Sequence, residues 1–260
     1  MKTKQAFKIF AFVILFFGVI GYVGYEMVGM SGGNPRELCT EVSLVVDENP
    51  NAAFIDDQKV EDLLLQAGLY PKNKLMRDVD TRAIEDVLKA NNFIDRVECY
   101  KTNNGMEVGK GKVCIRVVQR TPVIYVLPDN QNGYYVDADG MIIPNSAYAK
   151  NIIIATGNIN QDYATKELSL FGEFVMDNPY WDSRIEQLYV SADRKGRRVV
   201  TLIPRVGDHT VYMGTLDQFE KKLNRLKVFY EKGFPQVGWN KYNRLNLEFN
   251  NQVVCTKRKL

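Results

Sequence analysis

The stretch LCTEVSLVVDENPNAAFIDDQKVEDLLLQAG, residues 38–68, contains the two periodicities that decide the fold. Residues 38–46 alternate between apolar and polar side chains, which is typical of a half-buried β-strand. Asp56 is a suitable N-cap for a following helix, and Gly68 is a residue type favoured just after a helix ends. The apolar stripe between them consists of Val60, Leu63, Leu64 and Ala67. The stretch therefore predicts a strand followed by a helix.

The same kind of pattern continues toward the C-terminus. Asp80 is placed to cap a second helix, whose apolar face consists of Ile84, Val87 and Leu88. Two further strands are expected at residues 96–101 and 112–118, separated by the turn-forming stretch TNNGMEVGKG. The first folded region is thus predicted to have the element order β-α-α-β-β.

The N-terminal segment predicts a membrane anchor. Residues 9–25 carry no charge, a length that can span a hydrocarbon core of about 30 Å as a helix. The lysines of residues 1–8 favour a cytoplasmic N-terminus. The alternative is a cleaved signal peptide, but the exit YEMVGMSGG lacks a clear A-x-A site. We expect a tail at 1–8, a transmembrane anchor at 9–26, a linker at 27–37, and the remainder outside the cytoplasm.

Composition excludes several classes of protein. The chain has 260 residues, 45% of them hydrophobic and 25% charged, which is typical of globular domains. Its net charge of +3 comes from Lys2, Lys4 and Lys8, so the folded part is neutral and a nucleic-acid partner is not expected. The four cysteines leave disulfides and buried free thiols both open; they are Cys39, Cys99, Cys114 and Cys255.

Residues 123–260 predict a second, mainly β domain with packed helices. Short strand-forming runs occur at 123–127, 134–138 and 152–155. Two apolar stripes at helical spacing are expected to pack on the resulting sheet; they are Ala164, Leu168, Phe171 and Val175, and then Leu216, Phe219, Leu223, Leu226 and Phe229.

The second of these helices carries expected start and stop signals. Thr215 and Gln218 fit a capping box, and Gly233 with Pro235 fits a C-terminal stop. Its basic side chains are expected to form a solvated face, with binding of anionic lipid as the alternative; they are Lys221, Lys222, Arg225 and Lys227.

No catalytic, metal or cofactor site is expected. No serine has a lysine three positions later, so the S-x-x-K nucleophile and base are absent. The only histidine, His209, follows a Gly207-Asp208 turn and is expected at the surface. DADG at 137–140 fits a hairpin turn better than a calcium loop, and GKGK at 109–112 lacks the P-loop spacing. We therefore expect a binding protein without a small-molecule substrate.

The chain closes on RLNLEFNNQVVCTKRKL, residues 244–260, in which two β-prone runs, 244–249 and 252–255, flank Asn250-Asn251. Residues 248–255 hold neither proline nor lysine, which commonly protect an exposed sheet edge. Such an edge offers unpaired N–H and C=O groups to an incoming strand. The alternative is an internal, fully paired hairpin, and the sequence leaves both open.

Several stretches, taken in chain order, resemble the bacterial cell-division family FtsQ/DivIB. The β-α-α-β-β region outside a single anchor resembles a POTRA domain, and VVQRTPV at 117–123 resembles its exit in that family. Downstream, the resemblance is carried by YYVDADGMIIP (134–144), RRVVTLIPRVGDHTVYMG (197–214), LDQFEKKLNRLKVFYEKG (216–233) and LNLEFNNQVV (245–254).

The resemblance implies an α+β protein with a POTRA-like domain at 38–122 and a C-terminal β domain at 123–260. It implies a non-enzymatic, single-pass membrane scaffold at the division septum, whose partners are proteins of the FtsB and FtsL type. Members take up a partner strand at the C-terminal sheet edge. The corresponding residues here are Glu248, Phe249, Asn251, Gln252, Val253 and Val254, with Phe249 expected to contribute most as an aromatic anchor.

Two departures from the family pattern concern charge. Asn246 and Glu248 stand where members commonly have an aspartate and an arginine, and Gln119-Arg120 replaces an acidic residue before the exit proline. These departures suggest that the charges recognised on a partner are reversed. Two other function classes remain open. One is a POTRA-type chaperone or assembly factor for exported proteins, and the other is an enzyme with an unrecognised site.

Overall fold

The computed structural model describes residues 19–20, 22, 36–50, 52–103, 110–129, 131–146 and 152–258. The chain divides into two compact units. Unit 1 comprises Met1–Val45, Asp57–Leu88 and Val97–Val117, and unit 2 comprises Val46–Asp56, Lys89–Arg96 and Val118–Leu260. The expected tail, anchor (9–26) and linker lie outside the described residues apart from Val19, Ile20, Tyr22 and 36–37. Among the described residues, no helix has the length and apolar character needed to cross a bilayer.

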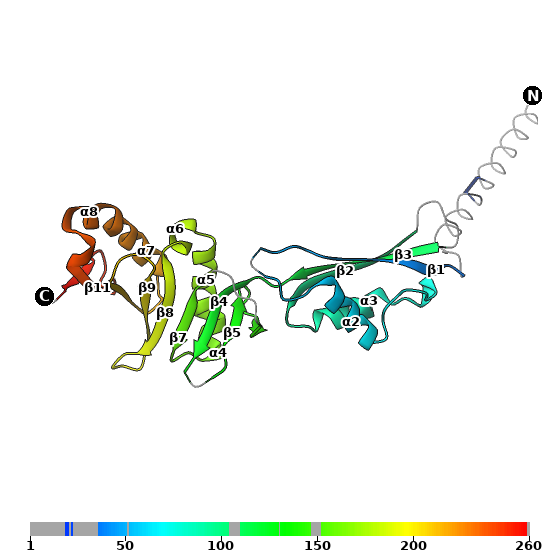
Figure 1. Ribbon diagram of the computed structural model, residues 1–260, viewed down its shortest axis with the longest axis horizontal. Coiled ribbons are helices and arrows are strands. Elements are labelled where there is room, and N and C mark those ends of the chain that lie inside the picture. Colours follow the sequence, from blue (N-terminus) through cyan, green and yellow to red (C-terminus); the bar gives the residue numbers. More distant parts are fainter. Residues whose placement is uncertain are drawn as a thin grey trace, which may run out of the picture. The chain divides into compact units, whose positions relative to one another are not determined.

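The N-terminal elements follow the expected β-α-α-β-β order, with a short 3₁₀ turn between the two helices (Figure 1). The three strands form a sheet in the order β1-β3-β2. Asp80 caps the second helix as expected, because its Oδ1 accepts the N–H of Ala83 at 3.0 Å. The elements are β1 (Leu38–Val46), α2 (Asp57–Gln66), η1 (Met76–Asp78), α3 (Thr81–Lys89), β2 (Ile94–Asn103) and β3 (Lys110–Gln119).

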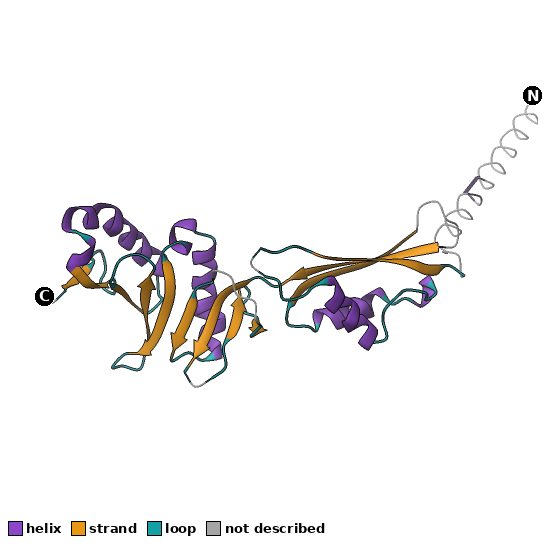
Figure 2. Ribbon diagram, in the orientation of Figure 1, coloured by secondary structure: helices purple, strands orange, loops and turns teal. Residues whose placement is uncertain are grey.

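Unit 2 is built on a nine-stranded mixed sheet in the order β12-β11-β10-β9-β8-β7-β4-β5-β6 (Figure 2). Three neighbouring pairs, β4–β7, β7–β8 and β10–β11, run parallel. The strands are β4 (Pro122–Pro128), β5 (Tyr134–Asp137), β6 (Ile142–Pro144), β7 (Ile154–Gly157), β8 (Ile185–Ala192), β9 (Arg198–Pro204), β10 (Thr210–Gly214), β11 (Tyr242–Asn246) and β12 (Val254–Lys257).

Helices provide the second layer of unit 2, and both expected apolar stripes contribute to its main core. Leu168, Phe171, Leu223 and Leu226 are all buried there together with strand residues such as Leu188 and Val200. The helical elements are α4 (Gln161–Tyr163), η2 (Ala164–Leu168), α5 (Ser169–Met176), α6 (Pro179–Asp182), α7 (Phe219–Val228), η3 (Phe229–Gly233), α8 (Phe234–Val237) and η4 (Trp239–Lys241), of which η2 and η3 are π-helical.

The start and stop signals expected for α7 are wrong. Gln218 is the N-cap in a left-handed conformation with φ of 53°, and its side chain makes no capping hydrogen bond. Thr215 Oγ1 instead donates to Asp217 Oδ2 at 2.9 Å. At the other end the helical path continues through η3 and α8 to Gly238, whose φ is +83°. Pro235 does not stop it, because it lies in the first turn of α8, where a missing N–H costs nothing.

Gln119 and Arg120 have internal roles in unit 2. Gln119 is buried, and its Oε1 accepts the backbone N–H groups of Phe54 at 3.0 Å and Ile55 at 3.1 Å. Arg120 Nη1 lies 2.8 Å from Oδ2 of the buried Asp137. Asp137 also fixes the β5–β6 turn, because its Oδ1 accepts the N–H of Met141 at 2.7 Å. Both residues of this departure from the family pattern therefore have partners within unit 2.

Two further expectations are settled by the side chains. His209, expected at the surface, is buried with 5% of its surface exposed. Cys39, Cys99, Cys114 and Cys255 are all free thiols. Partial burial, assisted by the neighbouring Glu85 carboxylate, raises the pKa of Cys99 to about 12, so this half-buried thiol stays protonated and is unreactive.

Candidate partner-binding edge

The last strand of the chain is a terminal strand of the nine-stranded sheet. β12 pairs with β11 in an antiparallel register that joins Asn246 to Val254 and Leu245 to Cys255. No other strand of the described chain neighbours β12 in that sheet order. One side of this strand is thus available for backbone hydrogen bonds with an additional strand.

Within this hairpin, β11 ends three residues earlier than the sequence suggests, and β12 begins two residues later. β11 ends at Asn246 and β12 begins at Val254, so residues 247–253 form a longer connection. Asn246 explains the early end of β11, because its Oδ1 accepts the N–H of Glu248 at 2.8 Å and removes that amide from a ladder. Asn251 then takes a left-handed φ of 60° within the connection.

Of the six residues expected to bind a partner, only Val254 lies in β12. Glu248, Phe249, Asn251, Gln252 and Val253 all belong to the connection. Phe249 and Val254 are large apolar side chains with 47% and 42% of their surface exposed, whereas Val253 packs against the main core. The structure therefore brings the six into one hairpin but divides them between its tip and its edge.

A groove of about 590 Å³ adjoins the connection. Its apolar lining includes Val228 and Phe229 from the helical side and Val253 from the connection, while Arg225 and Lys232 are its basic residues. The remaining lining residues are Asn224, Gly233, Asn251 and Gln252. The helical residues of this groove were not expected as part of the site. The one residue that could have indicated the groove is Val228, an apolar residue outside the buried stripe of α7. This residue is 53% exposed.

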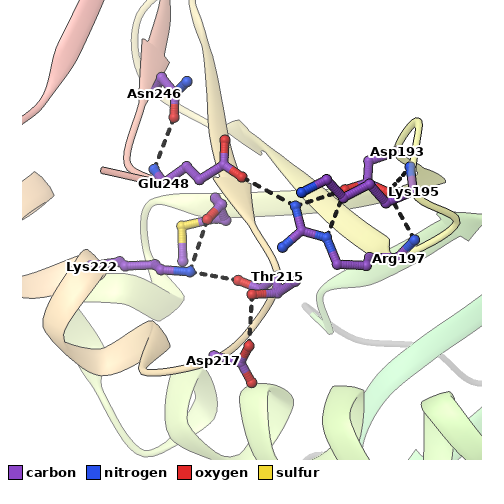
Figure 3. A network of polar contacts seen from close by, with 9 residues as sticks. Asp193, Lys195, Arg197, Thr215, Asp217, Lys222, Asn246 and Glu248 are labelled. Carbon is purple, nitrogen blue, oxygen red and sulfur yellow. Dashed lines mark hydrogen bonds and ion pairs between the residues drawn. The ribbon is translucent and has the colours of Figure 1, made fainter. Parts of the chain in front are cut away.

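Two basic residues of α7 hold the ends of neighbouring strands, so the expectation that they are solvated is wrong. Lys222 Nζ donates to the carbonyl oxygens of Met213 at 3.0 Å and Thr215 at 2.7 Å (Figure 3). Arg225 Nη2 donates to the carbonyl oxygen of Leu247 at 2.7 Å. Burial lowers the pKa of Lys222. These bonds satisfy carbonyl groups beside the connection and fix its position relative to α7.

A second, smaller pocket of about 150 Å³ also adjoins this connection and has charged walls. Glu248 and Asn250 contribute to it together with α7 residues such as Lys221 and Lys222. Glu248 Oε1 is also 3.6 Å from Nη2 of Arg197, which pairs with Asp193 at 2.8 Å (Figure 3). Asn246 and Glu248, the other departure from the family pattern, therefore both have partners within the unit.

The chemistry of this edge is that of a binding surface. It offers backbone groups along β12, exposed apolar side chains at Phe249 and Val254, and a groove with an apolar floor and basic residues. The end of β12 is basic, with exposed Lys257 and Arg258. Sequence reasoning missed Thr256 and Lys257 as edge residues, because it placed the strand two residues too early.

Family models match both parts of the chain. A POTRA-like domain matches residues 37–118, and the model described as FtsQ/DivIB, C-terminal related, matches residues 121–256. A comparison with curated proteins finds no match. The second match spans more than half of the 260 residues and runs from the start of β4 into β12. The chain therefore belongs to the FtsQ/DivIB C-terminal related family and carries a POTRA-like domain ahead of that region.

Proposed function

We propose that the chain is a non-enzymatic scaffold of the bacterial cell-division machinery. In this proposal residues 9–26 anchor it in the cytoplasmic membrane, and the POTRA-like domain and unit 2 face outward at the division septum. The scaffold holds other division proteins there so that septal peptidoglycan synthesis is coordinated with constriction. Family membership and the order of the two matched domains support this proposal.

The proposed mechanism is strand addition at β12. A segment of a membrane-anchored partner of the FtsB or FtsL type pairs with the outer side of Val254–Lys257 and extends the sheet by one strand. The observation that carries this mechanism is the terminal position of β12 in the nine-stranded order. Main-chain hydrogen bonds supply affinity in this mode of recognition, and pockets for alternate side chains supply specificity.

The groove beside the connection can supply the specificity, because it offers a pocket for a side chain of the partner. Its apolar floor, formed by Val228, Phe229 and Val253, can bury an apolar side chain of the partner. Arg225 and Lys232 favour an acidic residue close to that side chain. Because both proteins are confined to one membrane, tethering raises their effective concentration and a modest pairwise affinity is sufficient.

Photocrosslinking in cells tests this function with a control on the same sheet. A photoreactive residue is placed at Val254 in β12 or at Met141 beside β6, the strand at the opposite end of the sheet. The two positions are matched in exposure, at 42% and 47%. We expect position 254, and not 141, to capture a single-pass division protein of the FtsB or FtsL type. Capture of the same proteins from both positions, or no such protein from 254, would contradict strand addition.

A further inference from the structure

His209 is the only histidine of the sequence, and it is buried directly before β10. Its Nε2 lies 2.8 Å from the hydroxyl oxygen of Tyr230. Its Nδ1 is buried and has no hydrogen-bond partner in the described part of the chain. The backbone passes close to Nδ1 at Gly207, where a Cβ atom added to the glycine would lie 2.8 Å away. Only one of the two ring nitrogens therefore has a hydrogen-bond partner among the described residues.

Aromatic rings from one segment enclose this imidazole. The ring centroids of Phe234, Tyr230 and Trp239 lie 5.2, 5.5 and 6.2 Å from that of His209. All three belong to residues 229–241, which comprise η3, α8 and η4 and are called the aromatic segment below. Tyr230 stands in the π-helical turn η3, an irregularity that is frequent at functional positions.

Hydrogen bonds near His209 also hold the open end of the β11–β12 hairpin, where β11 begins and β12 ends. The aromatic segment ends at Lys241 and β11 begins at the next residue, Tyr242. Arg258, just beyond β12, donates its backbone N–H to the carbonyl of Lys241 at 3.1 Å. The Arg258 side chain donates to the Asp208 carboxylate at 2.7 Å and also to the Asp208 carbonyl. Both strands of the candidate edge are thus held beside His209.

The surroundings of His209 favour its neutral form. Burial lowers the pKa of His209, and the neighbouring Asp208 carboxylate opposes this only in part. Arg258 already pairs with that carboxylate. From the aromatic segment, Tyr230 faces the imidazole as a neutral phenol, because burial raises its pKa. Tyr180 raises this pKa further, and Arg184 opposes the rise only in part. In the protonated ring both nitrogens carry an N–H group, and the N–H on Nδ1 has no acceptor among the described residues.

We propose that His209 is an acid-operated latch for the last two strands. The neutral imidazole holds the aromatic segment against the start of β10 and thereby keeps β11 and β12 in the sheet. Protonation of the imidazole expels the ring from its aromatic surroundings, releases the segment and loosens both strands. The latch itself is independent of any partner. Its consequence, weaker partner binding in acid, rests on the proposed function.

The sign of the pH dependence follows from linkage. Because the pKa of His209 is lower in the closed form than the usual value of about 6.5, the open form binds the proton more tightly. Closure is therefore complete above about pH 6.5 and is lost as the pH falls from there toward the pKa of the closed form. For one proton, the opening equilibrium increases by up to about tenfold per pH unit in that window.

Two measurements on the full chain without a polyhistidine tag test the latch. NMR of the single, isotopically labelled histidine gives its pKa without any need for assignment. Hydrogen exchange followed by mass spectrometry compares residues 229–257 with β8 and β9 between about pH 5 and 7.5, a window that brackets the usual histidine pKa. We expect a histidine pKa below about 6.5 and a selective loss of protection in 229–257 of up to about tenfold per pH unit. The His209→Gln variant, which cannot be charged, is expected to show no selective loss.

The latch is overturned if the histidine titrates at or above its usual pKa. It is equally overturned if 229–257 and the two control strands change protection in parallel, or if His209→Gln retains the selective loss. Should His209→Gln fail to fold, the titration and the exchange pattern of the unaltered chain decide alone. Crosslinking from position 254 at neutral pH remains a separate test, so the proposed function can fail while the latch stands.

Discussion

Arg120 and Asp137 form a largely buried ion pair, with 14% and 6% of their side-chain surfaces exposed. We expect Arg120→Met to destabilise unit 2 by about 3 kcal/mol, because it leaves the Asp137 carboxylate buried without its cation. Urea unfolding followed by tryptophan fluorescence measures this directly, since Trp181 and Trp239 both lie in unit 2.

Arg96→Met is the matched control for that substitution. Arg96 approaches Asp95 only at 4.0 Å, and its side chain is 65% exposed. Exposed pairs of this kind contribute less than about 1 kcal/mol. Equal losses in the free energy of unfolding for the two variants would mean that burial of the Arg120–Asp137 pair does not increase its contribution to stability.

At the residue scale, the sequence predicted the positions whose partners are nearby in the chain. The Asp80 cap needs only the amide of Ala83, and residue type is sufficient to predict it. Gln119, Arg120 and His209 could not be placed in this way. Their partners lie far away in sequence, such as Phe54 for Gln119 and Tyr230 for His209. Only the folded chain reveals that these polar groups are buried and which groups they contact.

The β5–β6 hairpin illustrates the scale of single elements. Gly140 has φ of +77°, and a Cβ at this position would lie 2.3 Å from the carbonyl oxygen of Thr165 in η2. Gly196 has nearly the same φ, +75°, but open space around it. An alanine in the left-handed conformation costs about 1–2 kcal/mol at either site, and only Gly140→Ala adds a collision with backbone.

We therefore expect Gly140→Ala to lower the free energy of unfolding by at least about 1 kcal/mol more than Gly196→Ala, because overpacking typically costs about 1–3 kcal/mol. The same fluorescence-detected urea titration compares the two variants. A difference near zero would show that the hairpin can move away from η2 at little cost, and that the close approach at Gly140 is unimportant.

Elements with clear periodicity were predictable, and their ends were less so. The alternation of residues 38–46 predicted the bounds of β1 as observed. The expected end of β11 was wrong because the Asn246 side chain competes for a backbone amide, and β12 begins two residues later than expected. The expected capping box and stop of α7 failed for a related reason, since Thr215 bonds Asp217 and the chain passes through Pro235 without leaving the helical path.

At the scale of the whole molecule, the order of domains was readable from the sequence and agrees with the two family matches. The nine-stranded order was not readable. Its parallel β4–β7, β7–β8 and β10–β11 pairs join strands distant in the chain, and no local pattern specifies such pairing or its register. The terminal position of β12, on which the functional proposal depends, is consequently a result of the structure.

The central claim is that the outer side of β12 is open in the free protein and is filled by a partner's strand. Amide hydrogen exchange of residues 254–257, measured by NMR on the full chain with and without a partner of the FtsB or FtsL type, tests it most directly. We expect alternate amides along β12, those directed away from β11, to exchange quickly in the free chain and to become protected in the complex. Protection of all these amides before the partner is added, or fast exchange that persists in the complex, would contradict it.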